Sequence, residues 1–256
     1  MTTEPLLRAR DLQLGYGEFV LMRHVGFDVR AGEIFFIMGG SGCGKSTLLR
    51  ALMGLHPPQA GQIFYGKQDF WGGDEGARHG IMRRTGALFQ GGALWSSMTL
   101  AENVSLVLEE YTGLSEGDIR DQASLKLALV GLAGFEEYYP SEISGGMRKR
   151  AGLARALALD PPMLFLDEPS AGLDPVSSRM LDDLVLELRD TLHTAFVIVS
   201  HELASIFAIA DNSIFLDAGT RSITASGKPD DIVRDPKTEM SALNFLTRGG
   251  DRSVAA

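Results

Sequence analysis

The first third of the chain alternates short apolar runs with glycine and charged residues. Runs of this length, rich in β-branched and aromatic residues, predict strands. We expect a β-rich subdomain built from Leu6–Leu14, Val25–Val29, Ile34–Met38 and Gln62–Tyr65. The third run is apolar throughout, which is typical of a strand buried on both faces. A helix over Lys45–Met53 is expected soon after it.

The middle of the chain changes to helical periodicity. Three segments separated by glycine and proline repeat apolar residues every three or four positions: Leu100–Glu110, Glu116–Leu132 and Arg148–Leu159. Strands and helices then alternate again, with strands expected at Met163–Asp167, Ala195–Ser200 and Ser213–Asp217, and helices at Val176–Arg189 and Leu203–Ala210. This order predicts a parallel α/β sheet with a helical insertion.

We interpret the 256 residues as one domain. Residues 1–92 and 157–240 are expected to form a catalytic core with its β subdomain. Residues 93–156 are expected to form the helical subdomain, and 241–256 a C-terminal tail. The last eight residues, 249–256, are expected to be disordered.

The composition narrows the classes of function. A formal net charge of -9 argues against a nucleic-acid binder and against direct adhesion to anionic lipid, because both need a basic surface. The sequence has no apolar run of about 20 residues and no signal-peptide pattern. One cysteine excludes an internal disulfide framework and fits a reducing compartment. We therefore expect a soluble, cytoplasmic protein, held at any membrane by another protein.

Residues 39–46, Gly-Gly-Ser-Gly-Cys-Gly-Lys-Ser, fit the phosphate-loop pattern between an apolar strand and a helix. Glycines allow backbone N–H groups to close around phosphate oxygens, where a helix N-terminus adds positive potential. Lys45 is expected to reach the β- and γ-phosphates, and Ser46 to supply a hydroxyl to Mg²⁺. A turn that only joins strand to helix is the weaker alternative.

A second chemical motif ends the apolar run Met163–Asp167, which Glu168 follows directly. We expect Asp167 to support the Mg²⁺ shell. Glu168 is expected to point elsewhere and polarise the attacking water. Alone, such a pair is more often a helix cap or a solvated turn. Behind a phosphate loop the catalytic interpretation is favoured.

Residues 144–147, Ser-Gly-Gly-Met, precede a basic helix and resemble the signature sequence of the ABC ATPase family. Three other family motifs occur in the expected order along the chain: Gln90 resembles the Q-loop glutamine, Ser170–Asp174 the D-loop and His201 the H-loop histidine. Tyr16 lies upstream, where the family has an aromatic residue that stacks on adenine. Each residue alone would be an ordinary strand, turn or helix-start residue. The resemblance covers residues 6 to about 235.

The resemblance implies a P-loop, RecA-like ABC ATPase core with an antiparallel β subdomain and a helical insertion. It implies catalytic roles for Glu168, His201 and Gln90, and a metal site of Ser46, Gln90 and Asp167. The implied ATP contacts are Tyr16, Gly39, Gly40, Ser41, Gly42, Cys43, Gly44, Lys45, Ser46, Thr47, Ser144, Gly145, Gly146 and Asp174.

The resemblance also implies a head-to-tail homodimer. The signature loop at a helix N-terminus is an anion site, yet its own chain already has a phosphate loop. In the family, the signature loop of one subunit closes over the γ-phosphate held by the other. Two ATP molecules are then buried at the dimer interface, and their hydrolysis allows the interface to open.

Met147, where most ABC signatures have glutamine, and the segment Ala93–Val104 resemble the ATPases of Mla/Mce lipid transporters. This implies transport of phospholipid or similar hydrophobic molecules, and a place on the cytoplasmic face of the inner membrane. The implied partners are an integral permease, periplasmic Mce-domain proteins and a STAS-domain subunit. A longer C-terminal extension, which some relatives use to clasp the neighbouring subunit, looks truncated after Arg248.

Two other classes remain open. One is the ATPase of a small-solute importer, against which Met147 and the segment Ala93–Val104 speak. The other is a non-transport ABC protein of DNA repair or translation. Such proteins usually carry two cassettes or a long coiled coil, and the acidic charge disfavours nucleic acid.

Two further expectations concern single residues. Cys43 lies at the start of a helix beside Lys45, where positive potential should favour an accessible thiolate. Trp95 and Leu100 are apolar and lie in the segment that the resemblance places against the permease, so they are expected to form an exposed patch. For both, internal packing is the alternative.

Overall fold

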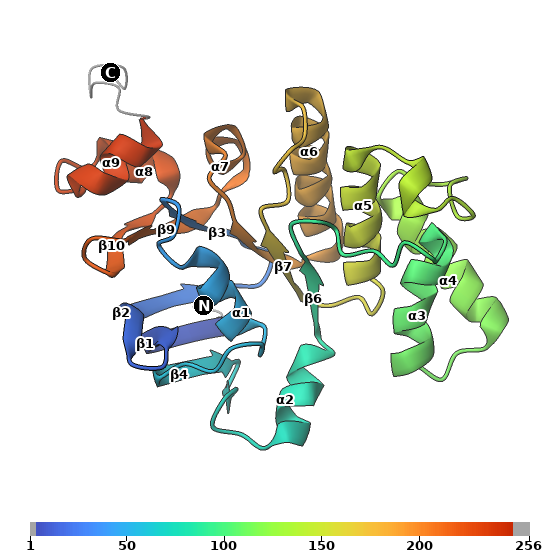
Figure 1. Cartoon of the computed structure of the whole chain (residues 1–256), viewed down its shortest axis with the longest axis horizontal. Helices are drawn as coiled ribbons and strands as arrows, with labels where there is room; N and C mark the ends of the chain where they lie inside the picture. Colours follow the sequence, from blue (N-terminus) through green and yellow to red (C-terminus); the bar gives the residue numbers. More distant parts are fainter. Residues whose placement is uncertain (1–3, 248–256) are drawn as a thin grey trace.

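The computed structural model describes residues 4–247, so the predicted disordered segment lies outside the described residues. The chain forms two sheets with helices around the larger one (Figure 1). The strand orders are β2-β1-β4-β5 and β10-β9-β3-β8-β7-β6. The α/β core and the antiparallel β subdomain that the sequence predicts are confirmed.

The smaller sheet is antiparallel and is built mainly from the first sixty-five residues. Its strands are β1 (Leu7–Tyr16), β2 (Phe19–Val29), β4 (Ala60–Tyr65) and β5 (Gln68–Asp69). β1 and β2 are longer than the predicted runs because a tight turn joins them directly and they pair along most of their length.

The larger sheet is parallel except at one edge. Its strands are β3 (Ile34–Gly39), β6 (Thr85–Leu88), β7 (Met163–Asp167), β8 (Ala195–Val199), β9 (Asn212–Asp217) and the antiparallel β10 (Ser222–Gly227). Parallel pairing brings the carboxyl ends of β3, β6 and β7 to one edge of the sheet. Ligands bind at this edge in open α/β sheets.

β3 shows why its sequence is apolar throughout. Ile34, Phe36 and Met38 belong to a core on one face of the sheet, which includes side chains of the helical insertion. Phe35 and Ile37 belong to a core on the other face, shared with the β subdomain and the helix after the phosphate loop. A strand buried on both faces has no polar position to alternate with.

The insertion contains three α-helices and one short 3-10 helix. They are α3 (Leu100–Tyr111), α4 (Glu116–Leu129), η1 (Pro140–Glu142) and α5 (Gly145–Ala156). Thr99 and Glu102 form a capping box that fixes the start of α3. Ser144 caps α5 by accepting from the N–H of Met147 at 3.2 Å, so this helix begins three residues before its predicted start.

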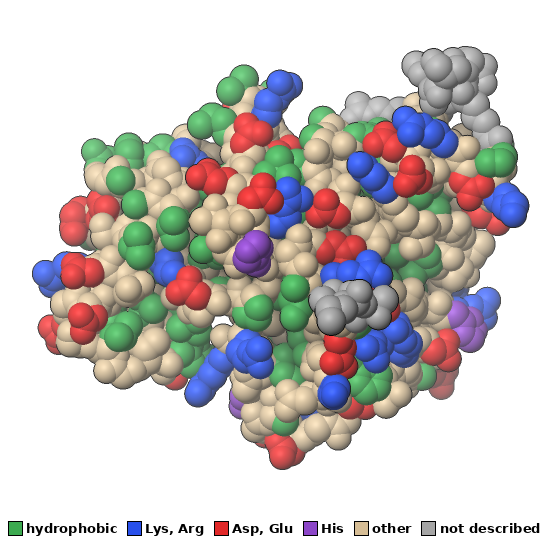
Figure 2. Space-filling view, turned by 180° about the vertical axis from the view of Figure 1, so that it is seen from behind, with side chains coloured by type: hydrophobic (Ala, Val, Ile, Leu, Met, Phe, Trp, Pro, Cys, Tyr) green, Lys and Arg blue, Asp and Glu red, His purple; other side chains and the backbone are tan. Residues whose placement is uncertain are grey.

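The remaining helices surround the larger sheet. They are α1 (Lys45–Leu52), α2 (Glu75–Met82), α6 (Pro175–Leu192), α7 (Leu203–Ile209), α8 (Pro229–Arg234) and α9 (Met240–Leu246). Within residues 4–247, none of the helices combines the length and the apolar character needed to cross a bilayer. On the rear face of the molecule, acidic and basic side chains are interspersed (Figure 2).

Candidate active site

The loop between β3 and α1 has backbone geometry suited to phosphate. Gly39 has a φ of 150°, and a Cβ there would lie 2.5 Å from the carbonyl oxygen of Leu216. Glycine is therefore required where the loop leaves the strand. α1 begins without a side-chain cap, so the N–H groups of its first turn are open to an anion.

Lys45 lies over this loop. Its Nζ donates to the carbonyl oxygens of Gly39 at 2.8 Å and Gly40 at 2.9 Å. A cleft of about 590 Å³ opens above the loop. Its lining brings together residues from six parts of the chain: Leu21, Gly39, Gly40, Ser41, Gly42, Gly44, Lys45, Ser46, Thr47, Gln90, Glu168, His201 and Phe245.

Ser46, which lines the cleft, is hydrogen bonded to Asp167. The Ser46 Oγ donates to Asp167 Oδ1 at 3.1 Å, which joins the first turn of α1 to the end of β7. Both are hard oxygen donors of the kind that Mg²⁺ prefers. Residues 4–247 contain no cluster of three or more His, Cys, Asp or Glu side chains that would hold a metal alone. The donor set therefore fits an ion that also uses water and phosphate oxygens.

Glu168 turns away from Asp167 although it is the next residue. Its φ of 49° is left-handed, which is costly for a side chain with a Cβ and has to be held by surrounding contacts. His201 Nδ1 donates to Glu168 Oε1 at 2.8 Å. The other oxygen, Oε2, is buried and has no hydrogen-bond partner among the described residues. The carboxylate is therefore oriented through one oxygen, while the other has no protein partner among the described residues.

Gln90 follows β6 and lines the cleft on the side of the helical insertion. Its backbone is held by α5, because Lys149 Nζ donates to the Gln90 carbonyl oxygen and also to that of Glu168 at 3.3 Å. Burial lowers the pKa of Lys149, and the negative charges of Asp167 and Glu168 oppose that shift. Lys149 was not among the predicted site residues.

Tyr16 lies at the margin of the site and does not line the cleft. Its ring is 52% exposed, and its hydroxyl is 3.2 Å from Thr47 Oγ1. The ring of His56 packs behind it with centroids 4.7 Å apart, and His56 is held by the Gly15 carbonyl oxygen at 2.9 Å. An exposed aromatic ring that packs against a second, hydrogen-bonded ring offers a flat surface on which a nucleotide base can stack. Sequence reasoning left His56 unassigned.

The signature residues lie outside this cleft. Ser144, Gly145 and Gly146 form the start of α5, and none of them lines the cleft beside the phosphate loop. Asp174 is also outside, where it caps α6 by accepting from the N–H groups of Val176 and Ser177 at 3.0 Å. Hydrogen bonds from Ser177, led by its hydroxyl, lower the pKa of Asp174. Within one chain, the predicted site is therefore divided into two groups.

The expectation for Cys43 is wrong. The side chain is 4% exposed and packs beneath the loop with the core of the β subdomain. Burial raises the pKa of the Cys43 thiol, and the charge of Lys45 only partly opposes this. The thiol is therefore a buried neutral group, which is the usual state of a free cysteine.

The expectation of an exposed patch is half right. Trp95 is 59% exposed, whereas Leu100 is fully buried in the core of the insertion. The backbone of Trp95 is fixed by buried Asn103, which accepts from the Trp95 N–H at 2.7 Å and donates to its carbonyl oxygen at 3.1 Å. The ring is thus presented outward by a rigid segment.

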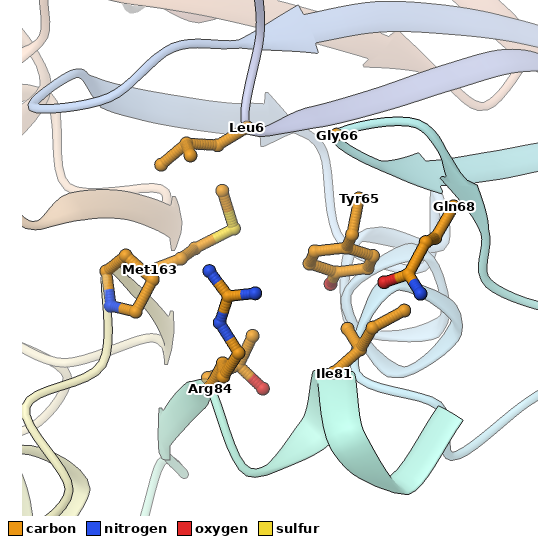
Figure 3. Close-up of a pocket in the computed structure, with 9 residues that line it drawn as sticks. Leu6, Tyr65, Gly66, Gln68, Ile81, Arg84 and Met163 are labelled. Atoms are coloured by element: carbon orange, nitrogen blue, oxygen red, sulfur yellow. The ribbon is translucent and has the colours of Figure 1, made fainter. Parts of the chain in front are cut away.

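A second cavity lies at the opposite ends of the parallel strands (Figure 3). Its volume is about 140 Å³, and it lies between the β subdomain, α2 and the starts of β6 and β7. Leu6, Tyr65 and Met163 face it, and Arg84 points into it from the segment after α2. No predicted nucleotide-binding residue lines this cavity.

Comparison with known proteins identifies the family of the chain. A family model described as ABC transporter matches residues 22–171. The intermembrane phospholipid transport ATP-binding protein MlaF of Haemophilus influenzae is 34% identical over 249 residues, covering 97% of this chain and 93% of that protein. The methionine import ATP-binding protein MetN of Cupriavidus metallidurans is 37% identical over 227 residues, covering 89% and 65%.

A mycobacterial relative and a solved structure complete the comparison. The Mycobacterium leprae protein named "Probable ribonucleotide transport ATP-binding protein mkl" is 40% identical over 206 residues; the match covers 80% of this chain but only 59% of that longer protein. The ATP-binding cassette MJ0796, solved as a post-hydrolysis dimer with ADP and Pi, superposes with a TM-score of 0.77 at 27% identity. It covers 87% of this chain and 98% of the cassette.

The family match includes both the phosphate loop and the Asp167–Glu168 pair, and the relatives extend it over most of the chain. The chain therefore belongs to the ABC transporter family, as an ATP-binding subunit with ATPase activity.

Proposed function

We propose that the chain hydrolyses MgATP in the cleft above the phosphate loop, with Glu168 orienting and activating the attacking water. The observation that supports this most directly is that the two carboxylate oxygens of Glu168 have different surroundings. Oε1 accepts a hydrogen bond from His201, whereas buried Oε2 has no hydrogen-bond partner among the described residues. A carboxylate held in this way accepts a proton from water without first having to be oriented.

The other cleft residues are proposed to bind the nucleotide. Lys45 and the open N–H groups of α1 would hold the phosphates, and Tyr16 would stack on the base. Ser46, Asp167 and Gln90 would hold Mg²⁺, which supplies charge neutralisation at the phosphate oxygens. The chain itself orients the triphosphate and places Glu168 beside the terminal phosphate.

The active unit is proposed to be a head-to-tail homodimer. Ser144, Gly145 and Gly146 present backbone donors at the start of α5, yet they lie outside their own cleft. A second copy would bring this helix N-terminus to the γ-phosphate, where negative charge is favoured. Asp174 would reach the same joint through the D-loop. ATP would thus complete a site that one chain leaves open.

Glu168→Gln tests the hydrolytic role. The amide keeps the shape of the side chain but cannot accept the proton, so turnover should fall by about 10²-fold or more while ATP binding persists. The variant should also accumulate as an ATP-bound dimer in size-exclusion chromatography. Near-normal turnover in a preparation free of other ATPases would remove Glu168 from this role.

We further propose that the transported molecule is a phospholipid or a similar hydrophobic compound. Support comes from the MlaF relative, which matches nearly the whole chain, and from the Ser144–Met147 and Ala93–Val104 segments. The ATPase would act on the cytoplasmic face of the inner membrane, on an integral permease with Mce-domain and STAS-domain partners. Exposed Trp95 is the proposed permease contact.

Import of a small solute is the second candidate, because MetN, named for methionine import, is 37% identical over most of this chain. Affinity capture of the intact membrane complex, followed by mass spectrometry of its subunits and extracted lipids, distinguishes the two. An Mce-domain subunit with enriched phospholipid supports the first candidate. A permease with a soluble amino-acid-binding protein supports the second.

A further inference from the structure

Side chains on one face of α5 donate hydrogen bonds to the backbone of residues 90–93, which follow β6. Arg155 donates to the carbonyl oxygens of Ala93 at 2.6 Å and Gly92 at 3.2 Å. Gly152 allows close approach, because a Cβ there would lie 3.0 Å from the Gly92 carbonyl oxygen. Lys149, one turn earlier on this face, donates to the carbonyl oxygen of Gln90. Segment 90–93 is therefore tied to α5 by side-chain hydrogen bonds at both of its ends.

Lys149 also holds the backbone of Glu168. Its Nζ lies 3.3 Å from the Glu168 carbonyl oxygen, and the side chain is buried with 6% exposure. Glu168 has the left-handed backbone that only surrounding contacts maintain. Lys149 is one of those contacts, so it helps to decide where the Glu168 carboxylate points.

A second buried lysine, Lys126, has a different kind of partner from Lys149. Lys126, on α4, is 2% exposed and pairs with Asp160 at 2.5 Å, away from the cleft. That pair joins two parts of the fold. Lys149 instead uses its donors on backbone carbonyl groups of two residues that line the cleft.

We propose that Lys149 is a positioning residue for hydrolysis, whose ammonium ties Gln90 and Glu168 to the helix that starts at the Ser144 loop. The inference rests on the proposed role of Glu168 and deepens it. A ligand that binds at the start of α5 is then connected, through Lys149 on the same helix, to the residue proposed to activate water.

Lys149→Met tests this, because it keeps an unbranched side chain only one heavy atom shorter and removes the ammonium donors. We expect kcat to fall about 10- to 100-fold, as for a small misplacement of a catalytic group. The Kd for a fluorescent ATP analogue should stay within about twofold, because no phosphate contact is lost. Lys149→Arg, which retains donors, should recover part of the lost kcat.

Arg150→Met is the matched control. Arg150 is the next residue of the same helix, but it donates to the carbonyl oxygens of Val130 and Gly131 at 3.0 and 3.1 Å, outside the cleft. This variant should lower the melting temperature and leave kcat close to wild type. An Arg150→Met enzyme with the same loss of kcat as Lys149→Met would overturn the proposal in favour of a general packing effect.

A double-mutant cycle separates positioning from packing. In a Glu168→Gln background, Lys149→Met should change residual single-turnover hydrolysis by less than about twofold, because the carboxylate it positions is already lost. An equal proportional loss in both backgrounds, or a wild-type kcat for Lys149→Met, would overturn the proposal. If Lys149→Met does not fold, Lys149→Gln, which keeps one donor group, is used in its place. Its kcat is expected to lie between the kcat of the wild type and the loss predicted for Lys149→Met. Normal hydrolysis by Glu168→Gln would instead refute the proposed function.

Discussion

Asp167 and Glu168 are sequence neighbours with different surroundings. Asp167 ends a strand, and its Oδ1 accepts a hydrogen bond from Ser46 Oγ. Glu168 has a left-handed φ of 49°, which turns its carboxylate to His201. One change of backbone conformation thus gives two adjacent carboxylates different partners, as the proposed roles of metal ligand and base require.

Asp182 is predicted to make stability depend on pH. Half-burial raises its pKa to about 6, although Ser205 donates to it at 2.8 Å. As pH rises from about 4 to 6, the unfolded chain ionises first, so the contribution of this group to stability falls. Asp182→Asn should therefore gain stability relative to wild type by about 1 kcal/mol between pH 4.5 and pH 7, after allowing for solvent screening.

Urea unfolding at the two pH values measures this difference. Glu187→Gln, an exposed carboxylate on the same helix, is the control and should show a smaller change with pH. An Asp182→Asn difference that is the same at both pH values would contradict the prediction.

Cys43 is predicted to react slowly in the folded chain. The thiol is buried and its pKa is raised, so both access and the thiolate fraction are low. Iodoacetamide at pH 8 should label it at least about tenfold more slowly in buffer than in urea, as followed by mass spectrometry. Cys43→Ala is the control, because the chain has one cysteine. Equal rates in buffer and urea would show that the folded site is open.

At this scale, motif spacing predicted most of the residues that line the cleft, but not Leu21 and Phe245, and not the contacts that support the site. Lys45, Gln90, Glu168 and His201 are brought together as expected. The support of Tyr16 by His56 depends on packing between distant segments, for which no local pattern exists. The error at Cys43 has the same origin: the motif indicates helix potential, whereas burial is set by the core beneath the loop.

At the scale of elements, long and periodic segments were predicted well. β7 has the bounds expected from its apolar run, and α3, α4 and α6 lie within a few residues of theirs. The elements that were not predicted are β5, β6, β10, α2, η1, α8 and α9. These elements have eight residues or fewer, so their sequences are too short to show a period, and contacts with the sheet or its neighbours stabilise them.

The segment between β6 and α3 is predicted to bind the permease through Trp95. Trp95→Glu should leave the isolated chain folded, because the ring is 59% exposed, but should reduce its recovery with membranes. Leu125→Glu is a matched control: Leu125 is 50% exposed on α4 of the same insertion. Fractionation of cells that express each variant with the complete transporter measures the effect. Equal recovery of both variants would count against this surface.

At the scale of the whole molecule, the larger sheet separates two cores. One core joins the sheet to the helical insertion, and the other joins it to the β subdomain and α1. The phosphate loop follows the central strand β3, whereas the Ser144 loop starts a helix of the insertion. The two proposed anion sites therefore belong to elements that pack in different cores (Figure 1).

This separation predicts complementation between two inactive variants. Lys45→Ala removes the phosphate clamp and Ser144→Arg blocks the signature loop, so each homodimer should be inactive. A mixed dimer carries both lesions at one composite site and leaves the other intact, so about half the wild-type activity per dimer is expected if the sites act independently. Differently tagged chains purified in tandem give the mixed dimer for an ATPase assay. Full activity of either homodimer would refute the arrangement.

The exclusion of the Ser144 loop from its own cleft has a kinetic consequence. If catalysis needs a second copy, the rate per chain in dilute solution should rise with chain concentration, so that total turnover is second order. Attachment of two copies to one permease would replace that dependence with a fixed effective concentration, in the millimolar range for a short tether. The permease would then set the rate of ATP hydrolysis by holding the two ATPase subunits close together, without contacting the residues that cleave ATP.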